Sequence, residues 1–248
     1  MSTETILMVT LGAAAGGFIN GLAGFGTALF ALGFFLNVMT PPQAVAIVVV
    51  LSVTSGLQGL WIVRHAIWDQ PRRMIRFMGP GVVGIPLGIA ALAVIDAASL
   101  KLVIASFLLI YGGFFTLRRA LPKFDRPTPM IDMIVGFAGG VLGGAASLSG
   151  ALPTMWCSMR PWPKAETRAV LQPFNVVILG LTALMLWWQG VYTRDVLWNL
   201  AIAIPGALIS AQIGISVFRR LSDDLFRRLL ISMCLLSGII LMIRAFTS

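Results

Sequence analysis

Two stretches of this chain set small polar side chains among glycines, in a pattern that suits the binding of an anion. Hydroxyl and amide groups can donate hydrogen bonds, and glycine lets the backbone approach a ligand closely or adopt a positive φ. Where a helix restarts after a break, its first N–H groups lack partners and carry the positive end of the helix dipole. We predict such restarts at Gly26-Thr27 and at Ser149-Gly150, each forming half of an anion site. The candidate residues are Asn20, Gly24, Gly26 and Thr27 in the first stretch and Ser147, Ser149 and Gly150 in the second.

Polar residues at helical spacing in two further apolar segments extend this candidate site. One face carries Ser52, Ser55 and Gln58, and another carries Arg168, Gln172 and Asn175. Polar groups at membrane depth usually face a bundle interior or a cavity. Two alternatives stay open: these groups and the glycines could serve helix packing alone, and Arg168 could extend to the membrane interface as a loop charge.

The inventory of reactive residues argues against catalysis and against a metal. The single histidine, His65, lies in a basic loop, and Cys157 and Cys234 lie within apolar segments. No Ser-His-Asp set, acid pair or His/Cys cluster can be assembled from these residues. We predict no enzyme, no catalytic residue, no metal site and no cofactor. Asp132 and the other segment-end aspartates are interpreted as interfacial, so no buried acid is expected to drive a proton or sodium pump.

The elements that would position these residues are transmembrane helices. Hydrophobic residues make up 58% of the 248 positions and charged residues 11%. Apolar runs recur at a length that crosses a hydrocarbon core of roughly 30 Å. The net charge of +9 does not indicate nucleic-acid binding, because the basic residues lie in short loops and no basic face is interleaved with aromatics. Eight segments are predicted, at about 6–38, 44–63, 77–95, 100–117, 130–159, 170–188, 196–218 and 225–243.

The distribution of basic residues decides how the segments cross. Fifteen of the 18 Lys and Arg residues fall in four loop clusters. All four lie on one side only if the fifth segment, 130–159, enters the membrane and returns as a hairpin of arms of about 15 and 12 residues. That arrangement obeys the positive-inside rule at every loop. By symmetry, we assign the same hairpin to segment 6–38.

The two halves of the chain repeat the same order of features. Gly17-Phe18 matches Gly136-Phe137, and Gly84-Ile85-Pro86 resembles Ala203-Ile204-Pro205, both at an offset of 119. Along the chain this offset drifts from 119 to 125 through small insertions. A hairpin plus three crossings is an odd number, so the second half must be inverted. The predicted fold is an all-α polytopic membrane protein of two inverted repeats, 1–125 and 126–248, with its site near the bilayer midplane between two glycine-broken hairpins.

These motifs resemble the sulfite exporter family (TauE/SafE). The resemblance rests on the glycine-broken segment, on Pro41-Pro42-Gln43-Ala44 opening a small-and-polar helix, and on Gly84-x-Pro86-x-Gly88, and it spans the whole chain. The chain departs from the family pattern in the first half, where no Pro follows Gly26 before Pro41, as in a divergent branch. The resemblance implies movement of sulfite or organosulfonates across a bacterial inner membrane.

The residues themselves predict a multi-pass permease for a small anion with its basic loops cytoplasmic, and the resemblance implies that it exports small sulfur-containing anions across an inner membrane. A negative interior drives anions outward without a coupling ion. The expected partners are the lipid bilayer and a small anion, with no nucleic acid; the small residues fit a monomer or a homodimer equally. The alternatives are a permease for another small solute or metal ion, and a membrane scaffold that transports nothing.

Overall fold

The computed structural model is helical throughout the part of the chain that it describes. That part comprises residues 2–69, 71–117, 124, 127–162, 164–222 and a few single positions beyond. Seven of the eight predicted segments coincide with helices, while segment 225–243 lies outside the described residues apart from single positions. The helices are α1 (Thr3–Ala23), α2 (Thr27–Phe35), α3 (Pro41–Asp69), α4 (Pro71–Leu92), α5 (Ala97–Leu117), α6 (Pro129–Ala146), α7 (Ala151–Ser158), α8 (Lys164–Trp188) and α9 (Arg194–Arg220).

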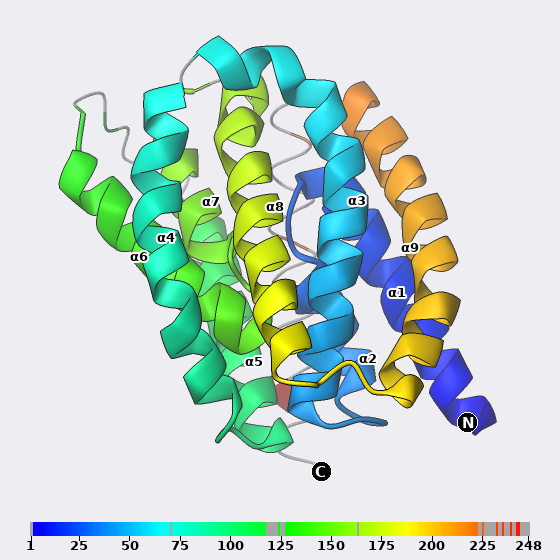
Figure 1. Cartoon of the computed structure of the whole chain (residues 1–248). Coiled ribbons are helices and arrows are strands. Elements are labelled where there is room, and N and C mark those ends of the chain that lie inside the picture. The colour runs from blue at the N-terminus through cyan, green and yellow to red at the C-terminus, as the bar shows by residue number, and fades with distance from the viewer. Residues whose placement is uncertain are drawn as a thin grey trace.

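The length and apolar composition of these helices identify a multi-pass membrane protein. Within the described ranges, six helices could each cross a bilayer: α1, α3, α4, α6, α8 and α9. In Figure 1, α3 and α9 rise from the lower end of the molecule to the upper end, and α4 and α8 descend. Short α2 and α7, of 9 and 8 residues, cannot span a hydrocarbon core of roughly 30 Å.

Both predicted breaks are present, and they fall close to the expected positions. Helix α1 ends at Gly24, with φ 82°, and α2 begins after Gly26, with φ 96°. Helix α6 ends at Ser147, with φ 59°, and α7 begins after Gly150. Left-handed backbone of this kind stops a helix and is easiest for glycine.

The arms around each break are less equal than the sequence suggested. They contain 21 and 9 residues in α1–α2 and 18 and 8 in α6–α7, whereas arms of about 15 and 12 were expected. The glycines that precede Gly24 in α1 and Ser147 in α6 do not end these helices, because they allow close packing against neighbouring helices. A Cβ at Gly16 would lie 3.1 Å from the Cβ of Ala31, so α2 folds back along α1.

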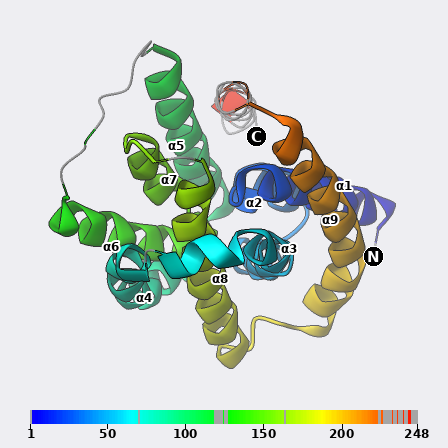
Figure 2. The same cartoon turned by 90° about the horizontal axis from the view of Figure 1, so that it is seen from above.

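Each hairpin also packs closely against a helix from the other half of the chain. A Cβ at Gly17 would lie 2.3 Å from the carbonyl oxygen of Ala207, and one at Gly140 would lie 1.9 Å from that of Gly81. Glycine thus lets α1 meet α9, and α6 meet α4, backbone to backbone. Figure 2 shows these two pairs on opposite sides of the molecule, with α3 and α8 side by side between them.

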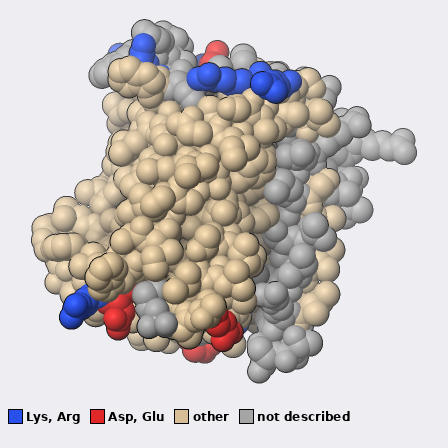
Figure 3. All heavy atoms as spheres, turned by 90° about the vertical axis from the view of Figure 1, so that its right-hand side faces the viewer, with Lys and Arg blue, Asp and Glu red and all other residues tan. Residues whose placement is uncertain are grey.

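Basic side chains gather at one end of the molecule. Arg64 at the end of α3, Arg72 and Arg73 at the start of α4, and Arg219 at the end of α9 lie at the same end as the α7–α8 connection. Figure 3 shows most of the visible Lys and Arg at this end, above a broad uncharged belt. The basic residues at 118, 119, 123, 126, 227 and 228 lie outside the described residues. We call this end the basic end.

The packing of α6 on α4 predicts a selective effect of one added methyl group. Gly140→Ala should lower the free energy of unfolding by about 1–3 kcal/mol, because the new Cβ overlaps the Gly81 carbonyl. Thermal unfolding in detergent measures the change. The matched control is Gly180→Ala in α8, where a Cβ would meet nothing within 4 Å; equal destabilisation by both variants would contradict the predicted contact.

Candidate functional site

The tips of the two broken segments meet in the interior at a small pocket lined by amide and hydroxyl side chains together with apolar ones. A Cβ at Gly150 would lie 2.8 Å from the Cβ of Phe25, so the tips are in contact. The cavity has a volume of about 10 Å³, which is enough for one water molecule. Its lining residues are Asn20, Phe25, Gly26, Ser52, Ser147, Leu148, Ser149, Gly150, Ala151, Asn175 and Leu179.

Asn20 supports the first tip and contributes an acceptor to the pocket. Its Nδ2 donates to Thr27 Oγ1 at 2.8 Å and to the Ser52 carbonyl oxygen at 3.2 Å. The side chain is 3% exposed, and its Oδ1 has no hydrogen-bond partner within the described part of the chain. A buried carbonyl group without a donor is costly, so a molecule in the pocket that donates to Oδ1 would be stabilised.

Asn175 joins the two tips. Its Nδ2 donates to the Gly24 carbonyl oxygen at 3.1 Å, and its Oδ1 accepts from the Ser149 hydroxyl at 2.7 Å. Because a carbonyl oxygen only accepts, these two bonds fix the orientation of the amide. Ser147, in left-handed backbone on the second tip, is 5% exposed, and its Oγ has no partner among the described residues.

The electrostatics of the pocket come from backbone and neutral side chains. None of the described residues lining it is charged. Helix α2 begins at Thr27, directly after the lining residue Gly26, and α7 begins at the lining residue Ala151, so the N-termini of both helices lie at the pocket. The Ala151 N–H donates to the Leu148 carbonyl oxygen at 3.2 Å, and Pro153 has no N–H. Two converging helix N-termini create positive potential without a basic side chain, which is a suitable environment for a small anion.

Arg168 lies behind the first tip, buried rather than extended to the membrane interface. It is 4% exposed; its Nη2 donates to the Gly21 carbonyl oxygen at 3.1 Å and its Nε to Gln172 Oε1 at 3.3 Å. The guanidinium also stacks 4.4 Å from the ring centroid of Phe218. A cation beside the last carbonyls of α1 opposes the negative end of that helix dipole. The alternative of an interfacial loop charge is therefore wrong.

The predicted residues fall into three groups by position. In the pocket lie Asn20, Gly26, Ser52, Ser147, Ser149, Gly150 and Asn175. One layer behind lie Gly24, Thr27, Arg168 and Gln172, whose Nε2 donates to the Gly56 carbonyl oxygen. Ser55, which donates to the Leu51 carbonyl of its own helix, and Gln58 do not line the pocket.

Four lining residues were missed because their side chains are apolar. They are Phe25, Leu148, Ala151 and Leu179. Two carried a usable signal: Phe25 stands between two glycines, and Leu179 continues the face of Arg168, Gln172 and Asn175. Leu148 and Ala151 differ in no visible way from other apolar residues of the segment.

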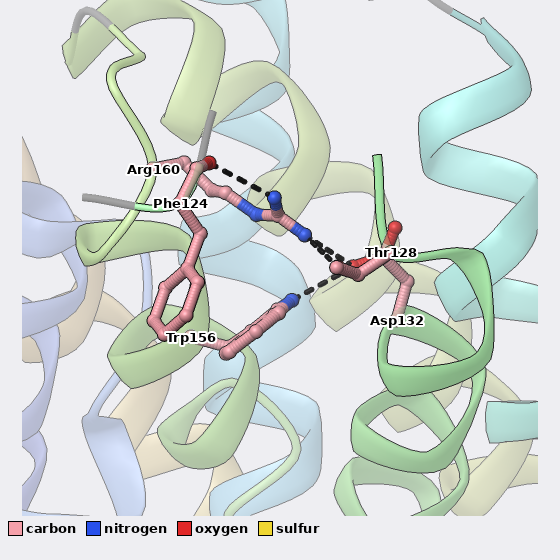
Figure 4. Close-up of polar contacts among 5 residues, drawn as sticks. All are labelled: Phe124, Thr128, Asp132, Trp156 and Arg160. Atoms are coloured by element: carbon pink, nitrogen blue, oxygen red, sulfur yellow. Dashed lines mark hydrogen bonds and ion pairs between the residues drawn. The ribbon is translucent and has the colours of Figure 1, made fainter. Parts of the chain in front are cut away.

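A second buried polar cluster lies toward the basic end, where α6 begins and α7 ends (Figure 4). Arg160 Nη2 pairs with Asp132 Oδ1 at 3.3 Å, and Trp156 Nε1 donates to the same oxygen at 2.7 Å. Arg160 also donates to the Phe124 carbonyl oxygen and to the Thr128 hydroxyl. Asp132, interpreted from sequence as interfacial, is 6% exposed. The cluster closes the open end of the α6–α7 hairpin.

Neither cluster has the composition of a metal site. In the described ranges, no three His, Cys, Asp or Glu side chains come close enough together to hold an ion. The pocket offers amide and hydroxyl groups and backbone N–H donors instead. These are groups that bind a small anion or a neutral polar solute.

Comparison with known proteins identifies a family of membrane transporters. The model of the sulfite exporter TauE/SafE family matches residues 8–241. The chain is also similar to the probable sulfite/organosulfonate exporter TauE of Cupriavidus necator, with 24% identity over 205 residues that cover 81% of this chain and 79% of that protein. No solved structure matches the chain.

The buried ion pair predicts an asymmetric response to substitution. Asp132→Leu should lower the free energy of unfolding by about 3–5 kcal/mol, because it leaves the Arg160 guanidinium buried without its carboxylate. The double variant Asp132→Leu/Arg160→Met should recover much of that loss. Thermal or denaturant unfolding measures both. A double variant less stable than the single one would show that the pair itself, rather than the uncompensated charge, sets the cost.

Proposed function

Because this chain belongs to the sulfite exporter TauE/SafE family of membrane transporters, we propose that it exports small sulfur-containing anions, sulfite or organosulfonates, from a site between its two broken helices. The observation that carries this proposal is the convergence of the α2 and α7 N-termini on one pocket that Asn20, Ser147 and Asn175 also line. An anion held there by neutral donors forms no ion pair with a basic side chain. Its release therefore does not require such a pair to break, which favours rapid release.

The size of the pocket implies that transport requires the tips to move. A cavity of about 10 Å³ holds one water, and a sulfur oxyanion is several times larger. The bridge from Gly24 through Asn175 to Ser149 holds the tips together in this closed arrangement. Separation of the tips at the bond between Asn175 and the Gly24 carbonyl oxygen would admit the anion.

Two inverted repeats, 1–125 and 126–248, are the proposed basis of that motion. Support comes from paired contacts: Gly17 meets Ala207 as Gly140 meets Gly81. Gly136 likewise meets Phe77 as Gly17 meets Ala207, and Gly136 lies 119 positions after Gly17, within the offset of 119 to 125 drawn from sequence. The open ends of the α1–α2 and α6–α7 hairpins also point to opposite ends of the molecule (Figure 1).

The proposed orientation places the basic end in the cytoplasm of a bacterial cell, by the positive-inside rule. With a negative interior, outward movement of an anion is driven by about 2.3 kcal/mol per charge at ~100 mV. Export then needs no coupling ion. The described residues of the pocket lining include no carboxylate, which fits an uncoupled route.

The rival functions would require different residues in the pocket. A metal-ion permease would want carboxylate, thiol or imidazole ligands, whereas the pocket residues supply amides, hydroxyls and backbone N–H groups. A scaffold would need neither a buried unpartnered Asn20 Oδ1 nor the converging helix N-termini. Transport assays on pocket variants separate the scaffold from the transporter.

We expect purified protein in liposomes to carry sulfite in the direction set by an imposed potential. An outside-positive potential should drive efflux of the anion, and reversal of the potential should reverse the net flux. Sulfoacetate tests the organosulfonate class in the same assay. No flux of either anion, in protein shown to be folded, would contradict the proposed function.

Pocket variants supply the matched controls. Asn175→Ala and Thr27→Val should lower the rate at least about tenfold, because each removes a hydrogen bond that shapes a tip. Asn199→Ala in α9 and Thr182→Val in α8 alter buried residues of the same types outside the pocket. These two should transport at the wild-type rate.

A further inference from the structure

The hydrogen-bonding atoms of the pocket include acceptors as well as donors. The Asn20 amide is fixed by the Ser52 carbonyl oxygen, which can only accept and therefore faces Nδ2. Oδ1 is consequently the atom of this 3% exposed side chain that has no hydrogen-bond partner among the described residues. An anion that offers only lone pairs would leave this oxygen unsatisfied or repel it.

Ser149 contributes a second acceptor by the same reasoning. Its hydroxyl hydrogen is donated to Asn175 Oδ1 at 2.7 Å, and that amide is fixed by the Gly24 carbonyl oxygen. The lone pairs of Ser149 Oγ are what remains for a molecule in the pocket. The donors come from the N-termini of α2 and α7, and Ser147 Oγ can act in either sense.

A ligand that matches this mixture is an anion with one hydroxyl group. Sulfite is in equilibrium near neutral pH with hydrogen sulfite, whose O-protonated form carries one negative charge and one O–H donor. Fully deprotonated sulfite and the sulfonate group present acceptor oxygens only. A site built to bond a substrate hydroxyl discriminates strongly against an analogue that lacks it, because its own buried group is left unpaired.

We propose that the pocket binds and carries hydrogen sulfite in its O-protonated form, with the hydroxyl donating to Asn20 Oδ1 or Ser149 Oγ and the other oxygens facing the α2 and α7 N-termini. This inference rests on the proposed function and specifies its substrate. The protein then moves one charge per sulfur. The proton travels on the substrate, so no titratable side chain is required in the pocket.

The charge carried per molecule gives the first test. In liposomes with equal pH on both sides, the reversal potential of the wild-type protein should shift by about 59 mV for a tenfold gradient of total sulfite, as for one charge. A shift of about 30 mV, as for two charges, would overturn the inference while leaving the transport function in place. No sulfite current from folded protein would overturn the proposed function as well.

An isosteric substrate gives the second test. Methanesulfinate has the same charge and pyramidal shape as hydrogen sulfite, with a methyl group in place of the hydroxyl. Wild-type protein should transport sulfite at least about tenfold faster than methanesulfinate. Asn20→Leu should remove most of this preference, whereas Asn199→Leu, which alters another buried asparagine with an unpartnered Oδ1 outside the pocket, should keep it. Equal rates for the two anions with wild-type protein would contradict the inference.

Discussion

The structure depends on how a helix can end inside a bilayer. The last carbonyls of a helix have no partner within it, and hydrocarbon offers none. Here α8 supplies the donors: Arg168 binds the Gly21 carbonyl oxygen and Asn175 binds that of Gly24. Since α8 begins at the basic end and crosses the molecule, one helix both anchors the first break and reaches the second through Ser149. The stabilised break is what leaves a polar pocket in the interior.

Close packing of backbones holds the two broken segments in place around that pocket. Gly17 and Gly140 let α1 and α6 approach α9 and α4 to distances that any side chain would prevent. Each hairpin is thus joined to a helix from the other half, and the tips are brought together by packing as well as by hydrogen bonds. Asp132 and Arg160 add a further restraint at the open end of the second hairpin.

Much of this arrangement could be predicted from sequence, because glycine and small polar residues are informative at membrane depth. The breaks at Gly24–Gly26 and Ser147–Gly150 were predicted within about one residue, since few residue types favour a positive φ or the start of a helix. The lengths of the arms were not predicted correctly, because in the sequence a glycine that allows close helix packing cannot be told from one that ends a helix. The burial of Asp132 and Arg168 depends on partners about 28 and 147 positions away, and no local pattern reports such a pairing.

The central claim is that the anion binds between the two tips, and a structure of the protein with sulfite bound would test it most directly. We predict density for the anion in contact with Asn20, Ser147 and the N-termini of α2 and α7, with Phe25 and Gly150 farther apart than in the closed pocket. Sulfite bound elsewhere, for example against the arginines of the basic end, with the tips still in contact, would contradict it.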